Sequence, residues 1–159
     1  MEIERKFLVS RIPDNCDAYP FRQIEQAYLC TDPVVRIRRE DANYYLTYKG
    51  KGLLSREEYN LPLNQKAYEH LLQKADGIIL TKKRCLIPIS DRPDLTIELD
   101  IFAGCYEGLA LAEVEFSTEE DAMSFTPPDW FGEDVTFTRE YQNSLLSQGL
   151  SPFFNNAAK

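Results

Sequence analysis

Residues 1–7 read Met-Glu-Ile-Glu-Arg-Lys-Phe, and this opening stretch carries the pattern that decides the fold. Charged and apolar side chains alternate along it. Successive side chains of a β-strand point to opposite faces, so alternation of this kind is typical of a strand. Glu2, Glu4 and Lys6 therefore share one face of a predicted strand over residues 2–9, and the opposite face is largely apolar.

The same period of two recurs along most of the chain. It predicts eight strands, over residues 2–9, 24–30, 34–40, 44–50, 54–62, 78–89, 95–103 and 108–116. Several links between them are short and rich in turn-forming residues, which favours antiparallel neighbours. Eight antiparallel strands with few helices indicate a mainly β fold of the α+β class, an eight-stranded antiparallel closed β-barrel with a few flanking helices.

Three helices are predicted between or after the strands. Asn64 is a suitable N-cap for a helix that runs to Ala75. The sequence Ser-Thr-Glu-Glu at 117–120 is a capping box that opens a second, short helix. A third helix is expected to open at Thr136 or Thr138. The apolar stripes of these helices need a surface to cover.

The composition is that of a single globular domain. The chain has 159 residues, of which 43% are hydrophobic and 28% charged, and we expect one domain over 1–154 with a loose tail at 155–159. The net charge of −8 argues against nucleic-acid binding, where phosphate neutralisation supplies most of the affinity. No apolar run approaches the roughly 20 residues that span a bilayer, so no membrane partner is expected. The charged start is unlike a signal peptide, which predicts a cytoplasmic protein.

The cysteines and the histidine offer little for catalysis. Cys16, Cys30, Cys85 and Cys105 form no Cys-x-x-Cys pair, which argues against a zinc site. In a reducing compartment they are expected to be free thiols. His70 is the single histidine and lies among polar residues of a predicted helix, so a nucleophile–histidine pair is disfavoured.

The charges on the strands are sorted by sign. Basic pairs occupy some strands and acidic pairs others, at Arg36 and Arg38, Lys82 and Arg84, Glu98 and Asp100, and Glu113 and Glu115. An apolar interior with a charged exterior is the ordinary arrangement for such strands. The alternative is a charged interior, with the helices covering an apolar outer face. Sorting by sign favours this alternative, because a solubilising surface usually mixes signs.

A charged interior implies an ionic ligand, since buried charges are costly unless they are paired. The inward basic set would comprise Lys6, Arg36, Arg38, Lys49, Lys82 and Arg84. Arginine forks suit phosphate oxygens, and lysine acts as a point charge. Facing carboxylates need a cation between them, and oxygen-only ligands suit Mg²⁺ or Mn²⁺. A polyphosphate with a divalent metal satisfies both sets.

The same residues resemble the CYTH domain family, also called the triphosphate tunnel metalloenzymes. The Glu-x-Glu-x-Lys of residues 2–6 is similar to the signature that opens this family, and the other motifs follow in the family's order. They lie at 26–29, 35–38, 46–49, 57–58, 82–84, 98–102, 111–116, 130–136 and 141–143. The chain departs from the pattern at Asn60, where the family often has a second acidic residue after Glu58.

The resemblance implies an eight-stranded antiparallel tunnel that binds a triphosphate small molecule together with Mg²⁺ or Mn²⁺. The residues it assigns to catalysis are Lys6, Arg38, Glu58, Lys82 and Arg84. Those it assigns to the triphosphate are Lys6, Arg36, Arg38, Lys49, Lys82 and Arg84, and those it assigns to the metal are Glu2, Glu4, Glu98, Asp100, Glu113 and Glu115. Relatives often dimerise, so the resemblance also implies a homodimer.

The predicted function is hydrolysis of inorganic triphosphate to pyrophosphate and phosphate, because the chain has little added sequence that could recognise a nucleoside. Two enzyme alternatives are adenylate cyclase, which converts ATP to cAMP and pyrophosphate, and thiamine triphosphatase. A polyphosphate-binding module without turnover is the alternative outside enzymes. Asn60 in place of an acid keeps that reading open.

Overall fold

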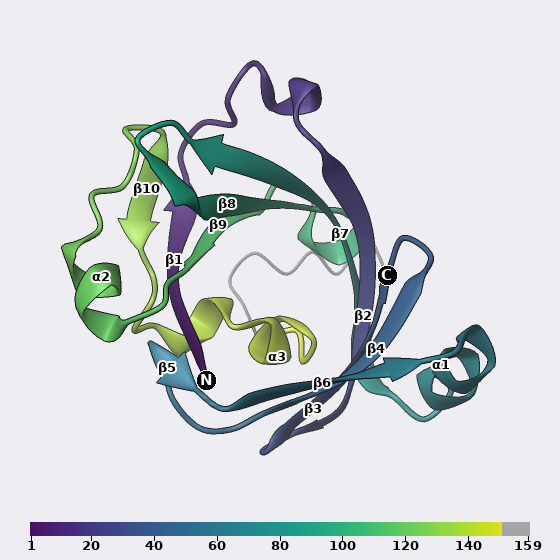
Figure 1. The fold of residues 1–159 in the computed structure, drawn as a ribbon. Coiled ribbons are helices and arrows are strands. Elements are labelled where there is room, and N and C mark those ends of the chain that lie inside the picture. Colours follow the sequence, from purple (N-terminus) through teal and green to yellow (C-terminus); the bar gives the residue numbers. More distant parts are fainter. Residues whose placement is uncertain (151–159) are drawn as a thin grey trace.

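In the computed structural model, which describes residues 1–150, the strands curve around a central axis to form an antiparallel barrel (Figure 1). Ten strands form the sheet: β1 (Glu2–Val9), β2 (Phe21–Thr31), β3 (Val34–Glu40), β4 (Asn43–Lys49), β5 (Ser55–Arg56), β6 (Glu58–Leu63), β7 (Asp76–Ile89), β8 (Arg92–Phe102), β9 (Ala110–Glu115) and β10 (Phe131–Asp134). The α-helices of this part are α1 (Gln65–Leu72), α2 (Glu119–Ser124) and α3 (Asn143–Leu146). The tail predicted at 155–159 and the preceding 151–154 lie outside the described residues.

The predicted strand over 54–62 is divided at Glu57, and its two parts nearly close the barrel. Before the break, Arg56 of β5 pairs with Glu2 of β1. After it, Glu58 of β6 pairs with Lys49 of β4. One continuous segment thus joins the first strand of the chain to the last strand of the β2–β3–β4 meander. The antiparallel barrel is confirmed as a nearly closed one, and the number of strands in residues 1–150 is ten instead of the predicted eight because of this split and β10.

Strand β10 was not predicted, because it is short and contains a glycine. It pairs with the far end of β1, with Phe7 opposite Asp134 and Val9 opposite Phe131. A Cβ at Gly132 would lie 3.1 Å from the backbone oxygen of Leu8, so the glycine permits this close approach. Four residues are too few to show a period of two.

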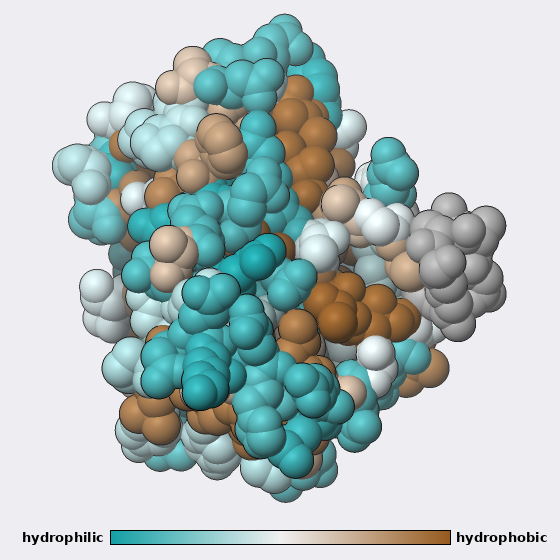
Figure 2. All heavy atoms as spheres, turned by 90° about the vertical axis from the view of Figure 1, so that its right-hand side faces the viewer, coloured by the Kyte–Doolittle hydropathy of each residue, from teal (hydrophilic) through white to brown (hydrophobic). Residues whose placement is uncertain are grey.

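Helices α1 and α2 cover the apolar outer face of the barrel, as expected for a charged interior, whereas α3 does not. Tyr68 of α1 is 2% exposed and packs with Ala27 and Ile37, whose side chains lie on the outside of β2 and β3. Ala122 of α2 packs in a second outer cluster with Val114 of β9. The surface on the α1 side is mainly hydrophilic, with smaller apolar areas (Figure 2). The charged faces of the strands therefore point inward.

The predicted helix caps are present. Asn64 accepts a hydrogen bond from the backbone N–H of Ala67 at 2.7 Å, and Thr118 caps α2 through its own side chain. The predicted end of the first helix at Ala75 was too late, because α1 ends at Leu72 in a tight turn before β7 begins.

Of the two predicted starts of the third helix, Thr138 is close to the structure, since it is the N-cap residue of the next helical turn, whereas Thr136 is wrong. Thr136 does not open a helix, because its hydroxyl is engaged with β1: it accepts from the backbone N–H of Lys6 at 3.0 Å and from Nε of Arg5 at 3.3 Å. The chain then forms a short 3₁₀ helix, Arg139–Tyr141, before the single turn of α3. In Figure 1, α3 lies within the ring of strands.

An apolar layer fills the end of the barrel beneath α3. On several strands the inward-facing residue two positions from a charged one, on the side toward α3, is apolar. Examples are Leu80, Phe102 and Leu111. Leu146 of α3 is fully buried against this layer. The charged lumen is therefore bounded on this side by an apolar floor. Among the residues described, no helix is long and apolar enough to cross a membrane.

Candidate active site

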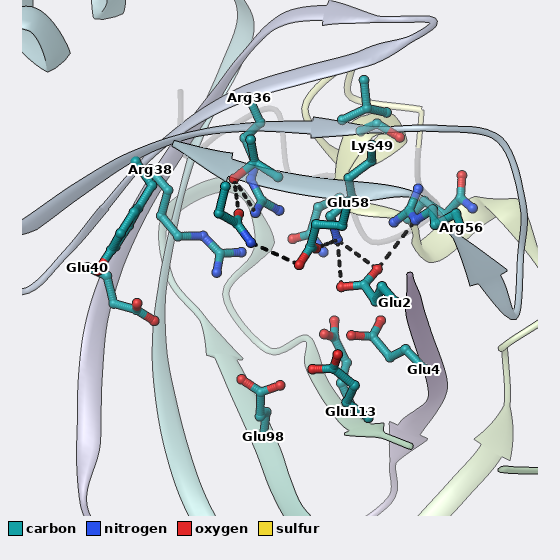
Figure 3. Close-up of a pocket in the computed structure, with 18 of the residues that line it drawn as sticks. Glu2, Glu4, Arg36, Arg38, Glu40, Lys49, Arg56, Glu58, Glu98 and Glu113 are labelled. Atoms are coloured by element: carbon teal, nitrogen blue, oxygen red, sulfur yellow. Dashed lines mark hydrogen bonds and ion pairs between the residues drawn. The ribbon is translucent and has the colours of Figure 1, made fainter. Parts of the chain in front are cut away.

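The lumen holds a cavity of about 280 Å³ with a wall of charged side chains (Figure 3). Most predicted site residues line it: Glu2, Glu4, Lys6, Arg36, Arg38, Lys49, Glu58, Arg84, Glu98, Glu113 and Glu115. Lys82 and Asp100 do not line it, since both side chains lie behind the wall with no exposed surface. The parity of the strands thus brought the two sets of charge to one cavity.

Three carboxylates converge on one side of the cavity. Glu4 of β1, Glu98 of β8 and Glu113 of β9 each place an oxygen within 4.8 Å of the other two. The strand register produces this, because Glu113 pairs with Glu98 on β8 and with Lys6, two residues from Glu4, on β1. Burial and the charges of Glu113 and Glu2 raise the pKa of Glu4 well above its usual value. A divalent cation with a preference for oxygen ligands would relieve this repulsion, so the group fits such a metal.

Glu113 differs from Glu4 because cations contact it. Its carboxylate lies 3.4 Å from Nζ of Lys6 and 3.5 Å from Nη2 of Arg84. Burial alone raises its pKa, but Lys6 and Arg84 outweigh burial and hold that pKa well below the usual value. Glu113 is therefore ionised at neutral pH and links the acidic cluster to the basic residues.

Asp100 holds two cations behind the cavity wall. Its carboxylate lies 2.7 Å from Nζ of Lys82, and Nε and Nη2 of Arg84 donate to it at 2.7 and 2.9 Å. Arg84 also contacts Glu98 at 2.7 Å. Burial lowers the pKa of Lys82 to about 7, although Asp100 opposes that shift. The geometry makes Asp100 a support for Arg84, outside the carboxylate cluster.

The opposite wall carries two guanidinium groups that form no ion pair with the residues described. Nη2 of Arg38 donates to Gln26 at 2.9 Å, and Nη2 of Arg36 donates to Thr47 at 3.4 Å. The Nε atoms of both are buried without a hydrogen-bond partner. Burial and the charge of Arg36 lower the pKa of Arg38 to about 10. Buried cations without an ion pair are costly, so this wall is built for an anion.

A hydrogen-bonded chain runs along the wall between these two regions (Figure 3). Lys49 contacts Glu2 at 3.0 Å and Glu58 at 3.2 Å. The amide of Asn60 donates to Glu58 at 3.0 Å and accepts from the hydroxyl of Thr47 at 2.6 Å. Although burial alone raises it, contacts with Glu2, Lys49 and Asn60 lower the pKa of Glu58 to about 2. Asn60, the residue that departs from the family pattern, therefore uses both its amide oxygen and its amide nitrogen in hydrogen bonds.

Sequence reasoning missed several lining residues. Arg56 lies 3.5 Å from Glu2, and it precedes Glu58 by two positions in a predicted strand, so parity could have found it. Gln142 and Asn143 also line the cavity, and Asn143 accepts from Nζ of Lys82 at 3.2 Å. These two come from the C-terminal segment, which has no period that would reveal an inward face.

The comparison with known families agrees with the barrel, with its charged interior and with the order of the motifs. Residues 1–148 match the CYTH domain, and the chain belongs to this family.

Two curated relatives are similar over nearly the whole chain. One is the inorganic triphosphatase of Nitrosomonas europaea, 41% identical over 150 residues that cover 92% of this chain and 96% of the relative. Another is the inorganic triphosphatase of Acetivibrio thermocellus, 36% identical over 155 residues that cover 91% of this chain and 92% of the relative. A crystal structure of an inorganic triphosphatase superposes with a TM-score of 0.69 at 36% identity, covering 92% of this chain and 94% of that one.

Proposed function

We propose that this protein hydrolyses inorganic triphosphate to pyrophosphate and phosphate, with Mg²⁺ or Mn²⁺. The observation that carries the proposal is a pair of guanidiniums, Arg36 and Arg38, with unsatisfied Nε–H groups and no ion pair among the described residues, facing a cluster of carboxylates across one cavity. An anion with several charges and a divalent cation complete such a site together. The two curated relatives, both inorganic triphosphatases, support the same substrate.

The basic residues bind the triphosphate in this proposal. Arg36 and Arg38 have free N–H groups for phosphate oxygens, and their planar forks suit bidentate contacts. Lys6, Lys49 and Arg84 supply further positive charge from other strands. Charge that develops on the leaving pyrophosphate is then stabilised by groups already in place. No nucleophilic side chain is required.

The carboxylates hold the metal in this proposal. Glu4, Glu98 and Glu113 are the nearest to one another, with Glu2 and Glu115 in the same wall. When bound, the ion would polarise phosphate oxygens and lower the pKa of a coordinated water. Lys6 and Arg84 keep Glu113 ionised, so it is ready to act as a ligand.

Lys82 and Asp100 act through other residues in this proposal. Asp100 is placed behind the wall and grips Arg84 through two hydrogen bonds. We therefore assign it to positioning of Arg84 rather than to the metal. Lys82 contributes its charge from behind the same wall.

The four cysteines are free, which is consistent with the cytoplasm as the compartment. We therefore propose that the protein is cytoplasmic.

The test is a substrate panel with inorganic triphosphate, ATP and thiamine triphosphate, each with Mg²⁺, Mn²⁺ or EDTA, while phosphate, pyrophosphate and cAMP are measured. The proposal predicts metal-dependent phosphate release from inorganic triphosphate, with little from ATP. Formation of cAMP and pyrophosphate from ATP would instead make the protein a cyclase. Tight binding of triphosphate without turnover of any substrate would make it a binding module.

A further inference from the structure

A second hollow adjoins the lumen at the end of the barrel where α3 lies. Its volume is about 410 Å³. Three segments form it: the turn at 31–34 between β2 and β3, the loop at 49–53 after β4, and residues between 139 and 148. The hollow and the lumen have these wall residues in common: Val34, Lys49, Arg56, Gln142 and Ser144. A single layer of side chains therefore separates the two, and we call the second one the vestibule.

The vestibule is basic within an acidic protein. Lys51 and Arg139 line it, are exposed, and form no ion pair with any residue that the structure describes. Lys49 and Arg56 also lie in the shared wall, but Glu2 and Glu58 pair with them, so the excess comes from Lys51 and Arg139 against the one acidic lining residue, Asp32. The whole chain carries a net charge of −8, so this local excess of positive charge is not a property of the average surface. Such a patch raises the local concentration of anions.

The vestibule also has neutral donors and a fixed wall. Gln148 donates to the hydroxyl of Thr31 at 3.0 Å, which ties the C-terminal segment to the β2–β3 turn. In the loop, Gly52 has a φ of +139°, and a Cβ there would lie 1.9 Å from the backbone oxygen of Ser55. Gly50 donates to the backbone oxygen of Glu57 at 2.9 Å. The loop is therefore held in one shape, which lowers the cost of ordering it on binding.

The two ends of the lumen differ in charge. Strand β3 begins at Val34 beside the vestibule and ends at Glu40, and β9 ends at Glu115, so these acids line the lumen toward the opposite end. At that end Glu40 is paired with Arg22 at 3.5 Å, so Glu115 is the carboxylate without an ion-pair partner among the described residues, whereas Lys51 and Arg139 at the vestibule are cations without one.

We propose that the vestibule is a second oxyanion site, which binds one phosphate group outside the lumen. This inference rests on the proposed function of the lumen. The phosphate group has two potential sources with the same chemistry. It is either the inorganic phosphate product on its way out of the barrel or a further phosphoryl group of a chain longer than triphosphate.

Calorimetric titration of the full chain with inorganic phosphate tests the site without turnover. The double variant Lys51→Ala/Arg139→Ala should bind phosphate roughly fivefold more weakly than the unchanged protein, since two exposed charge contacts are lost. Its matched control is Lys66→Ala/Lys74→Ala, which removes the same charge from exposed positions on and after α1 and should bind phosphate normally. Arg38→Ala should keep the vestibule component of phosphate binding, so a failure of the lumen proposal is distinguishable. Phosphate affinity of the double variant equal to that of the unchanged protein and of the lysine control would overturn the inference, whatever the result for Arg38→Ala.

Steady-state kinetics then identifies the source of the phosphate group. If it is the product, the double variant shows weaker inhibition by phosphate and an unchanged KM for triphosphate. If it is a further phosphoryl group, the KM for inorganic tetraphosphate rises roughly fivefold and that for triphosphate does not. Unchanged phosphate inhibition together with unchanged KM for both chains would leave the vestibule without a role and contradict the proposal.

Discussion

Glu113 is the residue at which the acidic and basic parts of the site meet. It lies in the carboxylate cluster and also contacts Lys6 and Arg84. Its two functions, as a metal ligand and as the counter-charge of two cations, both require an ionised carboxylate. Replacing Glu113 by glutamine removes the charge but keeps the shape of the side chain, so it tests these two functions without changing the packing.

We expect Glu113→Gln to lower kcat for triphosphate hydrolysis at least about 100-fold, because a preorganised charged group is lost at the reacting centre. The barrel should remain folded, which circular dichroism and thermal melting would check. Glu107→Gln is the control, because it makes the same chemical change at an exposed residue in a turn. Retained turnover in Glu113→Gln would remove this residue from the mechanism.

Asn60 is the second informative residue, because it replaces an acid that the family often has. Its amide bridges Thr47 and Glu58, and Thr47 in turn accepts from Arg36. An aspartate here would lose the donor to Glu58 and bring a negative charge toward Arg36. The asparagine therefore leaves that guanidinium free for the substrate.

Asn60→Asp should raise the KM for triphosphate roughly fivefold, because part of the positive charge is then neutralised within the protein. Steady-state kinetics with saturating metal measures this. Asn43→Asp adds the same charge at an exposed position of the β3–β4 hairpin and should leave KM unchanged. An unaltered KM in Asn60→Asp would mean that Asn60 does not influence Arg36.

At the scale of elements, the docking of β10 onto β1 is secured by polar contacts. Nη2 of Arg5 lies 2.7 Å from Asp134, and the backbone N–H of Thr136 donates to the same carboxylate at 2.9 Å. Burial raises the pKa of Asp134, but the contacts with Thr136 and Arg5 outweigh burial and lower it. A lowered pKa in the folded state stabilises the protein above the unfolded-state pKa, and this is lost as pH falls through the folded value.

Asp134→Asn should lower the free energy of unfolding by about 1 kcal/mol at pH 7, a modest loss because the side chain is partly exposed. Urea unfolding at pH 7 and at decreasing pH measures it. The difference from the unchanged protein should shrink as pH falls below about 3.9, the ordinary value for Asp. Asp129→Asn, at an exposed position, is the control. A difference that stays constant with pH would contradict the assignment to this ion pair.

The elements differed in how well the sequence predicts them. Long strands with a sustained period of two were found, because one face of each is charged and the other packs under α1 or α2. Strand β10 was not predicted, because four residues are too few to show an alternation of polar and apolar side chains. Of the two expected helix starts, Thr136 was wrong and Thr138 was close, because a potential capping residue can equally bond to a neighbouring strand, and sequence spacing does not reveal which.

At the scale of the molecule, the barrel has inverted the usual distribution of polarity. Its outer face is apolar under the helices, and its lumen is charged. The sorting of charges by sign predicted this inversion. Parity gives the face of a side chain but not its depth, which depends on the stagger of the strands. Arg84 lies opposite Asp100 and reaches the cavity, whereas Lys82 lies opposite Phe102 beside the apolar layer. The sequence could not separate these two cations.

In the proposed function, the lumen of the whole molecule brings a triphosphate and a divalent metal together. Phosphate release from inorganic triphosphate, measured after removal of metal with EDTA and again after Mg²⁺ is restored, tests this claim most directly. We predict no phosphate release with EDTA and full recovery of phosphate release with Mg²⁺. Without a bound cation, the carboxylates of the cluster repel one another and also repel the triphosphate. Equal release with and without metal would contradict the account.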